Sequence, residues 1–244
     1  MQSNRKFLSN LISSAGILVL AALTLHVSTA WSQQKSDSRS DKGNKLYGEA
    51  SIVSNYVDKG VTQSDKAPAL QAGFGYQMGP QARLGLWGSS VKFPSGGENL
   101  NLRFYADVKM DFTSNTNLIL KYTFNRFFQA DQHNGTILGL DFASFGYHVL
   151  FEMDDNFEGQ KSGGATWYAF KKDFQLPASF ILTPQLGYTQ TTVSGYNSYF
   201  DTRVSLGYKF ADVFYELVNT YNSNSSQFSG RGEMAFLFAL TVRF

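Results

Sequence analysis

Apolar and polar residues alternate one by one over long stretches of the chain. The pattern is clearest over residues 99–112, where Leu102 and Phe104 belong to an unbroken apolar set and Arg103 and Asp107 to the polar set between them. Because successive side chains of a strand point to opposite faces, this pattern predicts a strand with one apolar and one polar face. Helical spacing would scatter the same residues around the helix axis.

The alternation recurs along the whole chain after residue 44. Some copies are weaker, such as the one around Pro184, because proline removes a backbone donor from a strand ladder. Together the copies predict about twelve strands, over residues 45–57, 68–77, 82–92, 99–112, 117–127, 136–142, 145–153, 165–172, 179–189, 198–210, 213–221 and 232–244.

Two kinds of connection alternate between the predicted strands. The short ones lie at residues 78–81, 113–116, 143–144 and 211–212, with a longer one at 173–178. The long, polar ones lie at residues 58–67, 94–98, 128–135, 154–164, 190–197 and 222–231. Outer-membrane barrels join their strands in this way, by short periplasmic turns and long extracellular loops. We therefore predict an all-β fold: a transmembrane, antiparallel, up-and-down β-barrel over residues 45–244, with both the N and the C terminus in the periplasm.

The strands of a soluble β-sandwich also alternate, with their apolar faces turned inward. Alternation alone therefore does not show whether the apolar or the polar face points outward. Three features favour the membrane barrel. The polar faces carry many charges, and the chain ends on a strand with a terminal Phe244, which resembles the signal that the outer-membrane barrel-assembly machinery recognises. Aromatic residues also lie near predicted strand ends, where interfacial girdles are found. These are Tyr76, Phe112, Phe145, Phe174, Tyr188 and Phe210.

The first thirty residues have the features of an export signal. Arg5 and Lys6 precede an apolar run over residues 11–25, and Ser28 to Ala30 offers small residues to a signal peptidase. The run is shorter than the roughly 20 apolar residues that span a bilayer, so we expect residues 1–30 to be a cleaved signal peptide rather than an anchor. Residues 31–44 are polar and aperiodic, and predict a flexible periplasmic tail. This places the protein in the outer membrane of a Gram-negative bacterium, in contact with its lipid and lipopolysaccharide.

Composition excludes several functional classes. The chain has 21 Lys and Arg against 19 Asp and Glu, so removal of Arg5 and Lys6 leaves equal numbers of each. A nucleic-acid binder would carry a basic excess. The chain has no cysteine and three histidines, which is too few for a disulfide framework, a thiol nucleophile or an imidazole-rich metal site. We expect no cofactor, no metal and no nucleic-acid partner.

Residues 54–77, SNYVDKGVTQSDKAPALQAGFGYQ, carry a more specific signal. The segment resembles the start of the TorF-type porins, also described as the Gcw_chp family, and the resemblance implies an outer-membrane barrel of porin type without implying a substrate. Family members usually have an aromatic residue and Arg before the loop glycine, where this chain has Asp58 and Lys59. Lys59 keeps the positive charge but not the bidentate geometry of Arg. The matching residues are Ser54, Asn55, Tyr56, Val57, Gly60, Gln63, Ser64, Pro68, Ala69, Gln71 and Gly73.

Charged residues on the polar faces are the candidate pore-lining groups, since such groups set the field along a water path. The basic ones are Arg83, Arg103, Lys109, Lys121, Arg203, Lys209 and Arg243. The acidic ones are Asp107, Asp111, Asp141, Glu152, Asp201, Glu216 and Glu233, and His148 lies on the same faces. The first-loop motif adds Lys59, Gly60, Gln63, Ser64 and Pro68.

The sequence therefore favours a porin-like channel for passive diffusion of small hydrophilic solutes or ions. The alternative is a barrel plugged by cross-strand salt bridges, which acts in adhesion or as a receptor through its extracellular loops. The oligomeric state stays open.

Two other readings find weaker support in the residues. An outer-membrane lipid-modifying enzyme would need a nucleophile beside a base, and the residues two positions from His148 are Gly146 and Leu150. Residues 154–159 have the opening spacing of a calcium loop, but the twelfth position, which requires a bidentate Glu, is Ala165.

Overall fold

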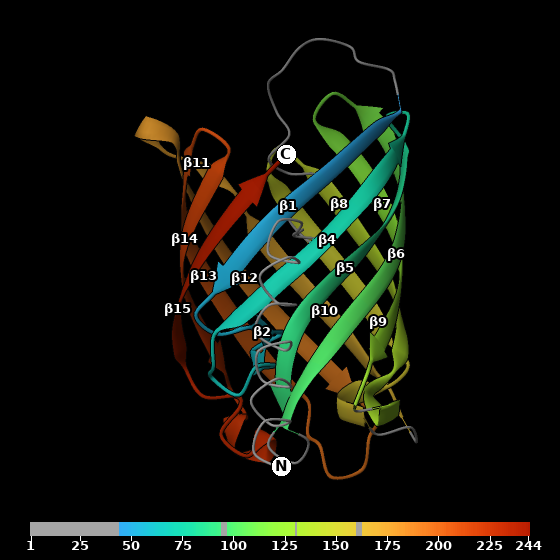
Figure 1. Cartoon of the computed structure of the whole chain (residues 1–244), viewed down its shortest axis with the longest axis vertical. Helices are drawn as coiled ribbons and strands as arrows, with labels where there is room; N and C mark the ends of the chain where they lie inside the picture. Colours follow the sequence, from blue (N-terminus) through green and yellow to red (C-terminus); the bar gives the residue numbers. More distant parts are fainter. Residues whose placement is uncertain (1–43, 94–96, 130, 160–162) are drawn as a thin grey trace, which may run out of the picture.

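Each long strand of the protein pairs with its neighbours in antiparallel order, and the last strand returns to the first. The computed structural model describes residues 44–93, 97–129, 131–159 and 163–244. In Figure 1 these residues form a closed barrel of tilted strands. The predicted signal peptide, residues 1–30, and all but the last residue of the predicted tail, 31–44, lie outside the described residues.

Twelve long strands make the barrel wall, which confirms the predicted all-β antiparallel barrel. The ring closes where β1 pairs with β15, with Ile52 opposite Leu240, and where β10 pairs with β12. The strands are β1 (Lys45–Val53), β4 (Ala69–Met78), β5 (Ala82–Phe93), β6 (Gly97–Thr113), β7 (Thr116–Phe127), β8 (Gly135–Ser144), β9 (Tyr147–Asp154), β10 (Ala165–Lys172), β12 (Phe180–Thr191), β13 (Tyr199–Phe210), β14 (Val213–Asn222) and β15 (Ala235–Arg243).

Short elements fill the connections between these strands. β11 (Phe174–Gln175) extends the sheet beside β12, and β2 (Val57–Asp58) pairs with β3 (Val61–Thr62). The 3-10 turns are η1 (Asp131–His133), η2 (Phe157–Gly159), η3 (Pro177–Ser179) and η4 (Ser225–Phe228). Among the described residues, no helix has the length and apolar character needed to cross a membrane.

The apolar face of the strands points outward. On β6, Phe104 is 49% exposed whereas its neighbour Tyr105 is 4% exposed. The same contrast holds on β5, where Leu84 is exposed and Arg83 is buried. A soluble sandwich would bury its apolar face and expose its charges, so this arrangement excludes the sandwich. An outward apolar band around a polar interior is typical of outer-membrane barrels.

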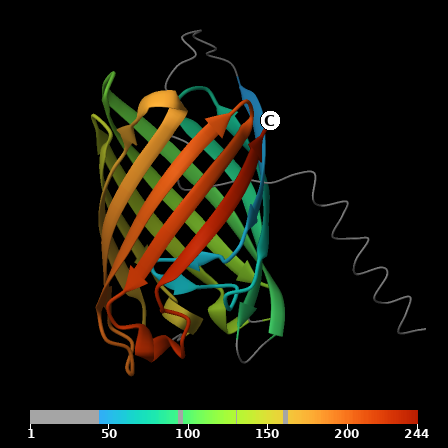
Figure 2. The same cartoon turned by 90° about the vertical axis from the view of Figure 1, so that its left-hand side faces the viewer.

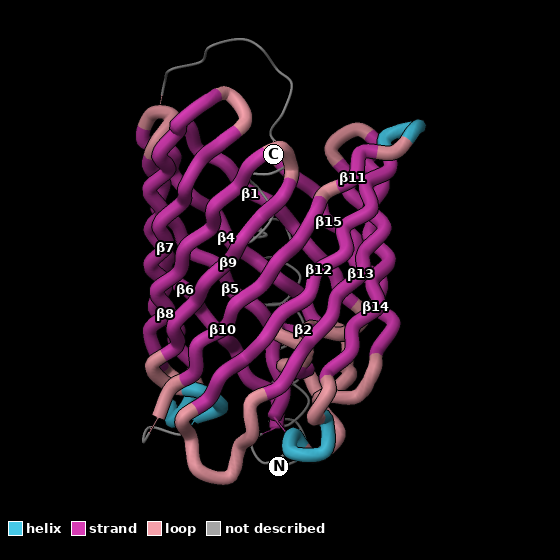
Figure 3. The backbone as a smooth tube through the Cα atoms, turned by 180° about the vertical axis from the view of Figure 1, so that it is seen from behind, coloured by secondary structure: helices cyan, strands magenta, loops and turns pink. Residues whose placement is uncertain are grey.

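The two ends of the barrel differ, as Figure 3 shows. The end that holds Lys45 and Phe244 carries the short connections, and we name it the turn end. The opposite end, which we name the loop end, holds η1, η2 and η4. Several of the predicted girdle aromatics are exposed around the turn end, namely Phe112, Phe145, Phe174 and Phe210.

The first connection does not extend outward from the loop end as predicted. Strand β1 ends at Val53, earlier than the predicted residue 57, and residues 54–68 turn back into the barrel. Figure 2 shows the β2–β3 hairpin crossing the interior above the loop end. The prediction of an extracellular loop at 58–67 is therefore wrong for the hairpin, because Asp58 and Lys59 find their partners on the inner wall. Lys66, in contrast, is exposed at the loop end and pairs with Glu233.

Candidate functional site: the constriction in the barrel lumen

The base of the inward hairpin is held by its own buried polar side chains. The Thr62 hydroxyl donates a hydrogen bond to Oδ1 of Asn55. The Ser64 hydroxyl accepts from the backbone N–H of Tyr56 at 2.9 Å and donates to the carbonyl of Ala67 at 2.6 Å. Asn55, Thr62 and Ser64 are all buried. Buried polar groups must be paired to avoid a desolvation cost, so these bonds favour the inward fold of the segment.

The tip of the hairpin reaches the inner wall of the barrel at β13 and β14. Lys59 and Gly60 both have left-handed backbone angles, with φ of 48° and 76°. The Tyr199 hydroxyl donates to the carbonyl of Lys59 at 3.1 Å, and Nδ2 of Asn222 donates to the carbonyl of Gly60 at 3.4 Å. A Cβ on residue 60 would lie 2.8 Å from Cβ of Asp201. Glycine is therefore required here both by the backbone angle and by the close approach.

Two ion pairs join the tip to two further strands. Nη2 of Arg103 on β6 lies 3.0 Å from Oδ2 of Asp58, and Nζ of Lys59 lies 2.8 Å from Oε2 of Glu152 on β9. The Arg103 guanidinium also lies 4.9 Å from the ring centre of Trp87. Charge-assisted hydrogen bonds of this kind are stronger than neutral ones, so the hairpin is held from several sides.

The electrostatics of the tip keep both of its ionisable groups charged. Burial alone would raise the pKa of the Asp58 carboxyl, but Lys59 and Arg103 outweigh it and hold that pKa below its ordinary value. Burial would likewise lower the pKa of the Lys59 ammonium, but Glu152 and Asp58 outweigh it and raise that pKa. At neutral pH the constriction therefore contains alternating positive and negative groups.

The hairpin lies between two cavities of the lumen. The larger has a volume of about 270 Å³ and extends towards the turn end, where Asp173 and Thr183 line it. The smaller has a volume of about 70 Å³ and is lined by loop-end residues such as Phe157 and Glu158. Both cavities share a boundary made of Asp58, Lys59, Arg103, Ile137 and Trp167.

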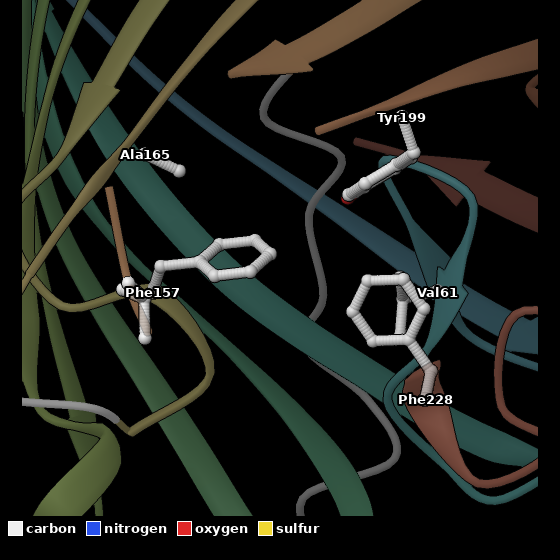
Figure 4. Close-up of a cluster of buried hydrophobic side chains, with 6 residues drawn as sticks. Val61, Phe157, Ala165, Tyr199 and Phe228 are labelled. Atoms are coloured by element: carbon white, nitrogen blue, oxygen red, sulfur yellow. The ribbon is translucent and has the colours of Figure 1, made fainter. Parts of the chain in front are cut away.

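An apolar cluster lies at the loop end, and Figure 4 shows its side chains. It joins Val61 of β3 to side chains from η2, η4 and the ends of β10 and β13. An ion pair between Arg231 and Glu158 lies beside it. The cluster packs the loops against the hairpin and so holds both in the mouth of the barrel. Its members are Val61, Phe157, Ala165, Val193, Tyr199 and Phe228.

The predicted pore-lining residues lie on the inward strand faces, with one exception, and they divide into two groups. Six line the larger cavity: Arg103, Asp107, Lys121, Glu152, Arg203 and Glu216. The others on these faces lie outside that lining: Arg83, Lys109, Asp111, Asp141, His148, Asp201, Lys209 and Arg243. Their role in a pore stays a prediction.

Glu233 is the exception. The predicted last strand began at residue 232, but β15 begins at Ala235, so Glu233 lies in the preceding loop. Its carboxylate is exposed and lies 2.5 Å from Nζ of Lys66. Glu233 is therefore a loop-end surface residue and not a lumen residue.

The first-loop motif and the terminal aromatic residue occupy defined places. Lys59 and Gly60 form the hairpin tip, Gln63 and Ser64 lie on its return limb, and Pro68 directly precedes β4. The Gln63 carbonyl accepts a hydrogen bond from the backbone N–H of Lys92 on β5 at 2.8 Å. Phe244 follows β15 and exchanges two backbone hydrogen bonds with Gly48. Whether Phe244 serves as an assembly signal stays a prediction.

Cross-strand ion pairs are frequent on the lumen face. Arg83 and Asp107 lie opposite each other on β5 and β6, with Nη2 of Arg83 2.5 Å from Oδ2 of Asp107. Nε of Arg243 lies 2.8 Å from Oε2 of Glu49. Such pairs are what the plugged-barrel alternative expects, yet they leave the 270 Å³ cavity between them.

The two weaker readings of the sequence gain no support from the geometry. Both ring nitrogens of His148 face carboxylates, with Nδ1 2.8 Å from Oδ1 of Asp141 and Nε2 3.7 Å from Oδ2 of Asp173. In the calcium-like loop, Nδ2 of Asn156 donates to the carbonyl of Asn134, and Glu158 pairs with Arg231. Within the ranges that the structure describes, no group of three or more His, Asp or Glu side chains is placed to hold a metal ion.

Sequence reasoning did not include four residues of the site. Asp58 was assigned to an external loop. Trp167 and Lys171 lie on the inward face of β10 and line the larger cavity, and the alternating pattern of that strand would have identified both. Trp87 on β5 could have been found by the same alternation. The periodic signal was therefore present for three of these residues, and absent for Asp58.

The barrel is similar to solved structures of membrane proteins. It resembles the KdgM porin with a TM-score of 0.52 and 9% sequence identity, over 83% of this chain and 98% of that chain. It also resembles a chain solved in work on the in-meso crystallization of membrane proteins, with a TM-score of 0.53 and 12% identity over 81% and 83% of the two chains. For the outer membrane protein Omp33 of Acinetobacter baumannii the TM-score is 0.47 and the identity 8%, over 82% and 98%. Identities this low show the fold alone. No curated protein matches the chain.

A family model described as a bacterial protein of unknown function, Gcw_chp, matches residues 37–233. The match begins before β1, includes the inward hairpin, and ends just before β15. Because it covers well over half of the 244 residues, the chain belongs to the Gcw_chp family.

Proposed function

We propose that this protein is an outer-membrane channel for the passive diffusion of small hydrophilic solutes or ions. The observation that supports this most directly is the cavity of about 270 Å³ inside a closed, outwardly apolar barrel. Its lining carries charges of both signs, including Lys121, Arg203 and Glu216. The porin role that the TorF-type resemblance implies agrees with this function.

The constriction accounts for the expected size limit of the solute. A twelve-strand barrel is intermediate between eight-strand barrels filled by side chains and open porins of sixteen strands. Here the hairpin tip and its partners, Arg103 and Glu152, lie in the lumen and line the larger cavity. A solute must therefore pass beside paired charges, which favours small polar molecules over large or apolar ones.

The orientation in the membrane follows from the two ends of the barrel. Short connections of outer-membrane barrels lie in the periplasm and long ones outside. We therefore assign the turn end, with Lys45 and Phe244, to the periplasm and the loop end to the cell surface. Export through the signal peptide of residues 1–30, insertion through the last strand with Phe244, and contact with lipid and lipopolysaccharide belong to the same proposal.

Single-channel conductance in planar bilayers tests this function. The protein is extracted from the outer membranes of an expressing strain that lacks its major porins, and insertion is checked by heat-modifiable migration. Discrete and reproducible current steps are expected, and the reversal potential in a salt gradient gives the charge preference. Inserted protein that passes no current would overturn the proposal.

A second function, adhesion or reception through the loop-end surface, is favoured by one observation. The apolar cluster around Phe157 and Phe228 closes much of the loop-end mouth, and the cavity on that side is only about 70 Å³. If the inserted protein is silent and stays silent when the tip carries Gly60→Val, the plugged barrel is the better description.

A further inference from the structure

Lys171 is a buried cation without a bound partner. It lies on the inward face of β10, lines the larger cavity and is only 5% exposed. Over the described ranges, no side chain or backbone group forms a hydrogen bond or ion pair with its ammonium. A buried charge without a partner is costly, so an unpaired ammonium at a cavity wall calls for a ligand.

The nearby carboxylates are already occupied by other donors. Asp141 faces Nδ1 of His148 at 2.8 Å, and Asp173 accepts from the Thr183 hydroxyl at 2.8 Å. Glu216 lies 2.9 Å from Nη2 of Arg203. Asp141 and Asp173 attract Lys171 over a longer range, but neither lies within ion-pair distance of it. Each of these carboxylates therefore already engages another donor, and the cavity wall around Lys171 also carries hydrogen-bond donors.

Two of these donors continue the row on the neighbouring strands. Gln185 of β12 lies opposite Lys171 of β10, and Arg203 of β13 lies opposite Gln185. All three line the same cavity. The Arg203 side chain is 31% exposed and uses Nη2 for Glu216, so the guanidinium is only partly engaged on the cavity wall. The charge of Lys121 also lies close enough to repel that of Lys171.

We propose that Lys171, Gln185 and Arg203 bind the oxyanion group of a small solute, a carboxylate or a phosphate, in the turn-side cavity. The proposal rests on the proposed function, because it names the class of solute that the channel would take. Carboxylate and phosphate oxygens accept hydrogen bonds from the three kinds of donor present here: the ammonium of Lys171, the amide N–H of Gln185 and the guanidinium of Arg203. Drug-sized ligands occupy pockets of about 300–1,000 Å³, so a cavity of about 270 Å³ suits a small molecule.

Isothermal titration calorimetry of the detergent-solubilised protein tests this site without any need for transport. The probes are succinate, inorganic phosphate and the uncharged analogue succinamide. Succinate or phosphate is expected to bind and succinamide is not, and the better of the two anions identifies the oxyanion. Equal binding of succinamide, or binding of neither anion, would overturn the proposal.

Variants locate the binding to the row of donors. Lys171→Met is expected to weaken anion binding by about tenfold or more, which corresponds to the loss of one hydrogen bond to a charged group. Lys171→Arg should restore most of it, and Gln185→Ala should weaken it less. The matched control is Lys209→Met, since Lys209 is on an inward strand face but does not line the cavity. Binding that is unchanged in Lys171→Met, with heat-modifiability intact, would overturn the assignment.

The two proposals fail in different ways. If the protein binds the anions but conducts no current, the anion site is supported and the channel function is rejected. If the protein conducts current but binds neither anion, the channel function is supported and the anion site is rejected.

Discussion

The ring of Phe244 lies over the bare backbone of Gly48, where the last strand meets the first. The two residues exchange backbone hydrogen bonds of 2.8 and 2.9 Å, and a Cβ on residue 48 would lie 2.5 Å from Cε2 of the ring. Residue 48 belongs to the outward face of β1, so the ring covers the seam of the barrel from the lipid side. The terminal aromatic residue thus has a packing role that is independent of any recognition during assembly.

This contact predicts a coupled loss of stability. Gly48→Val would displace the Phe244 ring, and Phe244→Ala would remove it, so each variant should lower the free energy of unfolding by about 1–3 kcal/mol. The double variant should lose little more than either single one, since both remove the same contact. Urea unfolding in detergent or lipid measures this. Additive losses would show that Phe244 and Gly48 act separately, and Ala50→Val on the same face of β1 is the control.

A second prediction concerns Gly60 at the hairpin tip. Gly60→Val places a Cβ against Asp201 and forces a β-branched residue to a φ of 76°, so the tip should withdraw from the wall. The expected result is a conductance larger by roughly twofold or more, because the constriction widens. Gly79→Val is the matched control: its φ is also positive, at 62°, but no atom lies within 4 Å of an added Cβ. The idea fails if both variants change the conductance equally.

The ion pair between Asp58 and Arg103 predicts a dependence on pH. The pKa of Asp58 is lowered in the folded protein, so its stabilising contribution is present above the ordinary carboxyl pKa of about 3.9 and is lost as the pH falls through the lower folded value. The contribution of this pair to the wild-type conductance should therefore stay constant from neutral pH down to about pH 4 and change only below it.

Asp58→Asn separates this effect from the titration of other carboxylates. The variant should have the altered conductance already at neutral pH and should lack the acid step, because residue 58 then has no charge to lose. Current recordings over a pH series measure both. If the variant keeps the acid step unchanged, another carboxylate is responsible for it.

The sequence allowed the barrel wall to be predicted well and the constriction hardly at all. Alternation identified Arg103 and Phe104 as residues of opposite faces because membrane and lumen impose opposite polarity on every second position. The inward path of Asp58 to Gly60 depends instead on Asp201 and Asn222, which lie far away in the sequence. No local pattern reports such a contact. Glu233 was misplaced for a related reason: the alternating pattern of the last strand extends back to residue 232, although β15 begins only at Ala235.

The last prediction tests the inward and outward faces themselves. Phe104 is 49% exposed on the outer face of β6, so Phe104→Arg would place a charge in lipid at a cost of about 2–4 kcal/mol near the midplane. This variant should assemble poorly, as measured by the heat-modifiable fraction in outer membranes. Arg103→Ala, one residue away, should assemble normally, since Arg103 lies on the lumen face and pairs with Asp58. It should, however, alter the conductance, because it leaves the Asp58 carboxylate without its guanidinium. Phe104→Leu controls for the loss of the aromatic ring. Normal assembly of Phe104→Arg together with failure of Arg103→Ala would require the two faces of β6 to be exchanged.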